Sequence, residues 1–203
     1  MGPIKRRRKR AKGERGSVLV EAAFITPIFM MLLFGVIEWG YGFMDRLTVA
    51  NSSLAGARVA SSEGSNSLAD YNILQAIAKA SSVMKSGQIQ VIVVYKATAP
   101  GGSTTSVPAA CLTASQSGSC NRYTGANFAS AQTLFGCAAG DLDIAWCPST
   151  TDSRKSAAAG VHGPPDYIGV YVQGVHTNAT GFFGSTYTFR GDTIIRIEPT
   201  TSS

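Results

Sequence analysis

The feature that most constrains this chain is an apolar run of twenty residues, Val18 to Ile37, close to the N-terminus. The run contains one charge, Glu21, together with one threonine, one proline and one glycine. Its length is about what a helix needs to cross the hydrocarbon core of a bilayer. A helix buried in a globular core would show a polar face, which this run almost lacks. We therefore expect one transmembrane helix over residues 17–42.

A strongly basic leader precedes the apolar run. Residues 1–16 carry eight lysines and arginines against Glu14, a net charge of +7, whereas the rest of the chain carries −1. Such a tail can direct a protein to the nucleus or contact nucleic acid. Directly before an apolar span it favours a cytoplasmic anchor, because positive residues stay on the cytoplasmic side. We expect no nucleic-acid partner, since a binding domain would carry its positive charge on a folded face.

A secretory signal peptide is the alternative for this segment, because it also joins a basic region to an apolar one. No small-x-small cleavage site directly follows Ile37. Trp39 and Tyr41 follow instead, and such aromatic rings favour the membrane–water interface. We therefore expect a single-pass protein with a cytoplasmic N-terminus and an exported C-terminal part.

The helical pattern continues past the membrane segment, so we expect residues 43–62 to extend the same helix outside the bilayer. Ser52, Gly56 and Ala60 recur every four residues and therefore lie on one face of that helix. Small residues on one face let another backbone approach closely, which makes these three candidates for helix packing. The polar cluster at residues 61–67 then predicts the end of this helix.

An exported α+β domain is expected over residues 63–203. A second helix is predicted from Leu68 to about Lys85, because apolar residues recur there at helical spacing. Segments rich in β-branched and aromatic residues predict a small antiparallel sheet. The predicted strands cover residues 88–96, 166–175, 185–190 and 192–199. Gly191 and Asp192 allow the last two to form either a tight hairpin or one bulged strand.

Four cysteines, Cys111, Cys120, Cys137 and Cys147, all lie in a loop-like region rich in small residues, 97–165. Disulfides persist in an exported domain, and four cysteines permit three pairings. We expect nearest-neighbour pairing, which closes two short loops. A zinc site is the alternative, but the C-x8-C and C-x9-C spacings lack the close pairs typical of structural zinc.

Catalytic patterns are missing from the sequence. His162 and His176 lie outside any metal-ligand pattern, and Asp141 and Asp143 lack the further oxygen ligands of a calcium loop. Neither a phosphate-binding loop nor a serine nucleophile motif occurs. We therefore expect no enzymatic activity, no metal and no cofactor.

Residues 14–60 resemble the TadE-like family of pilin-related membrane proteins. The family pattern joins a basic leader, an Arg-Gly pair, a glutamate five residues later, an apolar helix with an early proline, a distal acidic residue and a closing GARxA element. In this chain the pattern falls on Arg15, Gly16, Glu21, Pro27, Glu38 and the segment 56–60.

The resemblance implies a pseudopilin or minor pilin that contributes to assembly of a tight-adherence (Flp, type IVb) pilus or its secretion system in a bacterial cytoplasmic membrane. It implies three partners: a prepilin-type leader peptidase that cuts between Gly16 and Ser17, other pilin subunits, and the lipid bilayer. Glu21 would then pair with the new α-amino group of a neighbouring subunit. Interfacial snorkelling of Glu21, which needs no partner, is the alternative.

An alternative function also remains open at this point. The chain can be a single-pass membrane protein whose exported domain binds a ligand or a surface, with the helix only an anchor. In that case substitutions of Gly16 and Glu21 would leave function intact.

Overall fold

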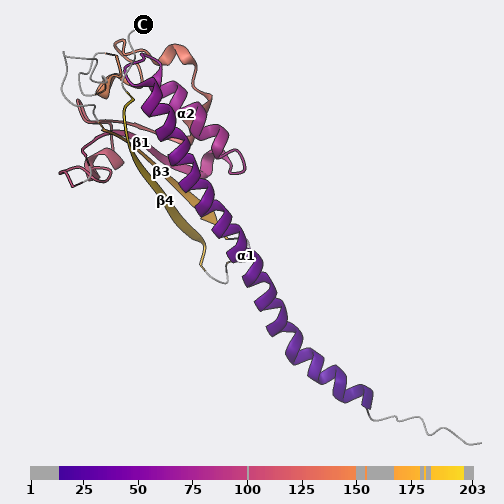
Figure 1. Cartoon of the computed structure of the whole chain (residues 1–203). Coiled ribbons are helices and arrows are strands. Elements are labelled where there is room, and N and C mark those ends of the chain that lie inside the picture. The colour runs from indigo at the N-terminus through magenta and orange to yellow at the C-terminus, as the bar shows by residue number, and fades with distance from the viewer. Residues whose placement is uncertain are drawn as a thin grey trace, which may run out of the picture.

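One helix, α1 (Glu14–Glu63), runs for 50 residues and joins an exposed stalk to an α+β head (Figure 1). The computed structural model describes residues 14–99, 101–149, 154, 167–178, 181 and 184–198. At 1.5 Å per residue α1 is about 75 Å long. The helix continues through Pro27, the early proline of the apolar run. The expected α+β class is confirmed.

A second helix, α2 (Ala69–Ala80), packs against the C-terminal half of α1. Ile73, Leu74 and Ile77 form its buried face. The helix ends five residues before the predicted end at Lys85, so that boundary was wrong. Ser81 is the C-terminal cap, where φ of −98° and ψ of 16° depart from helical values and its hydroxyl donates to the carbonyl of Ile77 at 2.7 Å.

Four strands form one antiparallel sheet in the order β2-β1-β3-β4. They are β1 (Ile89–Ala97), β2 (Cys120–Tyr123), β3 (Tyr167–Thr177) and β4 (Thr186–Arg196). The two helices cover one face of this sheet (Figure 1). The loop that contains Cys111 packs against the other face, beside Val91, Val93 and Tyr95 of β1. Burial on both faces explains why β1 is an almost unbroken apolar run.

Strand β2 was not predicted, because residues 97–165 were expected to form loops without a strand. Its four residues pair with β1, from Ile92 opposite Tyr123 to Tyr95 opposite Cys120. A segment this short has no room for the alternation by which strands are recognised. Its position depends on long-range pairing with β1, which the local sequence does not encode.

The last strand was also predicted differently, as two segments in a hairpin or one bulged strand. The structure has one continuous strand, β4, whose register with β3 runs without a shift from Tyr167–Arg196 to Thr177–Thr186. Gly191 lies in the middle of it for a packing reason. A Cβ atom there would lie 2.8 Å from the carbonyl oxygen of Val49 and from the hydroxyl of Ser53 on α1. The glycine therefore permits α1 to lie close against the sheet.

Candidate functional site

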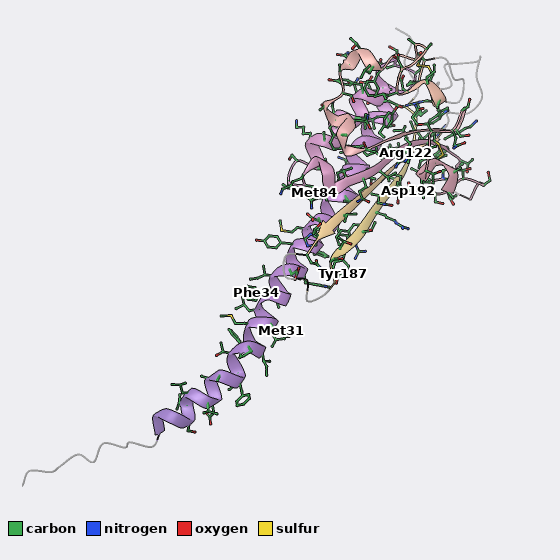
Figure 2. The ribbon with its side chains drawn as sticks, turned by 180° about the vertical axis from the view of Figure 1, so that it is seen from behind. Met31, Phe34, Met84, Arg122, Tyr187 and Asp192 are labelled. Carbon is green, nitrogen blue, oxygen red and sulfur yellow. A yellow bond between two sulfur atoms is a disulfide. The ribbon has the colours of Figure 1, made fainter. Side chains whose placement is uncertain are left out.

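The N-terminal half of α1 is exposed on all sides. Every residue from Gly16 to Ile37 except Gly35 is exposed, including Leu19 and Phe24, which are 73% and 72% accessible. Figure 2 shows the labelled side chains of Met31 and Phe34 on this stalk. By length and composition α1 is the one helix in the described part of the chain that can cross a membrane. An apolar surface of this extent needs a nonaqueous environment, because about 25 cal/mol is lost for each Å² left in water.

The predicted cleavage and pairing residues lie at the base of this stalk. Gly16 is exposed near the start of α1, and no atom of the described residues lies within 4 Å of a Cβ built on it. Ser17 and Glu21 are exposed and lie one helical turn apart, about 6 Å along the axis. The Glu21 carboxylate therefore lies one turn from any α-amino group that cleavage would create at Ser17.

The small-residue face of α1, formed by Ser52, Gly56 and Ala60, packs against other elements of the same molecule. Ser52 and Ala60 are 0% and 1% accessible. A Cβ on Gly56 would lie 2.8 Å from Ile77 of α2 and 3.1 Å from Val170 of β3. The face predicted for helix packing thus lies against α2 and the sheet of the same molecule.

A groove of about 830 Å³ lies where the stalk meets the head. We call it the junction groove. Met31, Leu32, Val36, Trp39, Phe43 and Arg46 of α1 line one side, and His176, Asn178, Tyr187 and Phe189 line the other. Tyr187 lies at the end of the sheet nearest the stalk (Figure 2). Sequence reasoning did not find this groove, because its walls are about 140 residues apart in the chain.

A side-chain hydrogen bond joins α1 to the end of β3 beside this groove. Nδ1 of His176, at the end of β3, lies 2.8 Å from a carboxylate oxygen of Asp45 on α1. The sequence places His176 outside any metal-ligand pattern and predicts no contact for it. The contact instead ties the end of β3 to the helix at the point where the head begins.

A buried polar cluster fixes the cysteine-rich region to α2. The carboxylate of Asp70 accepts hydrogen bonds from the guanidinium of Arg154, from the amide of Asn121 at 2.7 Å and from the hydroxyl of Tyr123 at 2.6 Å. Arg154 also lies over the ring of Trp146, 4.5 Å from its centroid. Burial, and then the charge of Asp70, raises the pKa of the Tyr123 hydroxyl well above its usual value. The cluster is structural, since all five residues lie in the interior.

The cysteines form two disulfides, Cys111–Cys120 and Cys137–Cys147. This is the nearest-neighbour pairing, and it leaves no free thiol among the described residues. The first disulfide joins the edge strand β2 to the loop over the second face of the sheet. The second closes a loop that begins where Cys137 adopts a φ of 72°.

The two aspartates of this loop serve its backbone. Asp143 accepts hydrogen bonds from the N–H groups of Gly136 and Cys137, both at 3.1 Å, and Asp141 accepts one from Ala138 at 2.8 Å. Burial raises the pKa of the Asp143 carboxyl above its usual value. Within the described residues no three histidine, cysteine or acidic side chains are grouped as metal ligands. His162 lies outside the described residues.

Comparison with known proteins gives a match at the stalk. Residues 16–58 match the family described as TadE-like protein. The searches of curated proteins and of solved structures found no match. The matched segment contains Glu21, Pro27 and Glu38, covers the exposed stalk and ends within the part of α1 that packs on the head. The resemblance of this chain to the TadE-like family is therefore confirmed over residues 16–58.

Proposed function

We propose that the protein is a membrane-anchored pseudopilin or minor pilin that contributes to assembly of a tight-adherence (Flp-type) pilus or its secretion system. One observation carries the proposal. The TadE-like match lies on a single helix whose first half is apolar and exposed and whose second half is packed into a folded head. Such a molecule can be held in a membrane and can present its head outside it.

The dimensions of α1 support this placement. The segment from Ser17 to Ile37 is about 30 Å long, which equals the thickness of a hydrocarbon core. Trp39 and Tyr41, both exposed, then lie at the outer interface, where aromatic rings favour the boundary between lipid and water. The basic leader favours a cytoplasmic position for the other end of the helix. The head lies on the exported side, where its two disulfides are stable.

Cleavage of the leader would create the ammonium group that we expect Glu21 to pair with during assembly. A prepilin-type leader peptidase that cuts between Gly16 and Ser17 would leave an ammonium group at Ser17. Glu21 then lies about 6 Å inside the hydrocarbon, where an uncompensated carboxylate is costly. Pairing with the ammonium group of a neighbouring subunit would compensate that charge and set the register between two helices. Substitution of Glu21 would therefore weaken assembly more than membrane insertion.

The Glu21 experiment tests this function. Glu21→Gln, expressed in the native host in place of the wild-type chain, should lower the number of surface pili seen by electron microscopy. The amount of protein in the membrane fraction should stay within about twofold of wild type. Glu63→Gln, at the other end of α1, is the matched control and should assemble normally. Normal pili with Glu21→Gln would contradict the proposal and favour a protein whose helix only anchors a binding domain.

A further inference from the structure

A row of exposed residues runs along α1 from the stalk into the head. These residues recur at alternating spacings of three and four, which is the heptad repeat of a coiled coil with its a and d positions. The a positions are Met30, Ile37, Met44 and Asn51, and the d positions are Leu33, Gly40, Leu47 and Leu54. We call these eight residues the α1 seam. All eight are exposed, and α1 continues without a break through them (Figure 1).

The head packs on the opposite side of the same helix. Val49 and Gly56 are both buried, and they lie about 170° around the helix from the middle of the seam. None of the seam residues lines the junction groove. A second molecule can therefore approach the seam from the side of α1 that faces away from the sheet.

Lipid covers only the lower part of the seam. With residues 17–37 in the hydrocarbon, Leu47 and Leu54 lie about 15 and 25 Å beyond its outer boundary. The head-group layer adds only about 5–8 Å on each side, so both leucines stand above it. Ala50 and Ala55, which flank the seam, are small and uncharged, so a partner helix can come close without burying a charge. The exported part of the seam therefore fits a protein helix rather than a lipid.

Membrane anchoring determines how a second copy of the chain would meet this seam. Two copies with the same end of α1 in the same membrane hold their helices parallel and at the same height, so each seam residue faces its own counterpart. Asn51 then faces Asn51 of the second copy, and each amide supplies both a donor and an acceptor. A stagger of one heptad would place Asn51 against Met44 and leave its amide unpaired, which is costly. A single asparagine at an a position sets register and partner number in this way.

We infer that two copies of the chain associate through the α1 seam as a parallel, in-register coiled coil. The inference rests on the membrane placement proposed above. Leucine at the d positions 47 and 54, with one asparagine at the a position between them, is typical of two-stranded coiled coils. Arg58 occupies the next a position and ends the seam, because two facing arginines repel each other. The pair holds its two heads at one height and on opposite sides of the joined helices.

Disulfide trapping tests this contact on the full-length chain. The four native cysteines form two disulfides, so one added cysteine is the only free thiol. In native-host membranes treated with a mild oxidant, Leu47→Cys should form a dimer, because the seam brings the two α-carbons within the roughly 7 Å that a disulfide spans. Arg46→Cys, at the neighbouring exposed residue outside the seam, is the matched control and should stay monomeric. Monomers from both variants, or equal dimer from both, would overturn the inference.

Mixed expression tests the register. Leu47→Cys and Leu54→Cys, carrying tags of different mass, should each link to its own kind and not to each other. Mixed dimers at the yield of same-position dimers would show staggered helices and would overturn the inference. An adduct of Leu47→Cys with a different protein would show another partner in the seam and would overturn it as well.

A charge at the centre of the seam tests the pairing of Asn51. Asn51→Asp preserves the size of the side chain but sets two carboxylates against each other. The yield of Leu54→Cys dimer should therefore fall at least about tenfold, a factor that corresponds to about 1.4 kcal/mol. Arg46→Gln changes the net charge by the same amount outside the seam and should leave the yield unchanged. An unchanged yield with Asn51→Asp would overturn the in-register pairing. Both residues are exposed, so neither change disturbs the packing of the head.

The coiled coil and the proposed pilin function can fail separately. Normal pili in a host whose Leu47→Cys chain gives no dimer would overturn the coiled coil and leave the proposed function intact. Normal pili with Glu21→Gln, in a chain that still gives the Leu47→Cys dimer, would contradict the proposed role of Glu21 and support the coiled coil.

Discussion

The buried pair of Asp70 and Arg154 offers the sharpest test of how the head is held together. Both side chains are fully buried, and Asp70 is the common acceptor for Arg154, Asn121 and Tyr123. Asp70→Ala removes these hydrogen bonds and leaves the guanidinium without its counter-ion. Removing one partner of a buried pair costs about 3–5 kcal/mol. That is a large fraction of the roughly 5–15 kcal/mol by which a domain is stable.

Thermal unfolding in detergent micelles measures this loss. The chain has two tryptophans, and Trp39→Phe leaves the buried Trp146 as the reporter beside Arg154. For a protein of this size we expect Asp70→Ala to lower the melting temperature by about 6–20 °C. Asp141→Ala, which removes a half-buried carboxylate with a hydrogen bond to a loop N–H, should cost at most about 1 kcal/mol.

A double variant tests whether the loss of stability comes from leaving one charge of the Asp70–Arg154 pair without its partner. Asp70→Leu with Arg154→Leu removes both charges, and replacing a buried pair by apolar residues is often neutral. The double variant should therefore be more stable than either single variant. Additive losses, or an Asp70→Ala variant within 1 kcal/mol of wild type, would refute the assignment of the head's stability to this pair.

Two further predictions concern packing and pH. Gly56→Ala places a Cβ 2.8 Å from Ile77, so its free energy of unfolding in denaturant should be about 1–3 kcal/mol lower than that of Gly40→Ala, whose Cβ meets nothing within 4 Å; equal stabilities would contradict the close contact. The pKa of Tyr123 is raised in the folded head, so the free energy of unfolding is highest below pH 10 and falls above it, by up to about 1.4 kcal/mol per pH unit. Tyr123→Phe should reduce that slope in alkaline titrations, and an unchanged slope would contradict the shift.

The features encoded in short stretches of sequence could be predicted. The apolar run predicted the exposed stalk, and its family pattern falls on the same helix. β1 and β3 were expected near their observed positions, because each is a continuous segment of β-branched and aromatic residues. The spacing of the cysteines favoured the pairing that the structure has.

The features that depend on contacts between distant segments could not be predicted. Gly191 suggested a turn, but it is needed where α1 approaches β4 across 140 residues of sequence. The Asp70–Arg154 pair, the Asp45–His176 pair and the junction groove each join segments that no local pattern links. Each of these contacts depends on the tertiary fold, so single residues carry no signal for them.

The mature N-terminus tests the central claim of a processed, membrane-anchored pilin-like subunit most directly. The protein is extracted from membranes of its native host, and its intact mass and N-terminal peptide are measured by mass spectrometry. We predict a chain that begins at Ser17 and lacks the leader, residues 1–16. A chain that retains Met1 or Gly2 in those membranes would contradict cleavage at Gly16 and, with it, the proposed pairing of Glu21.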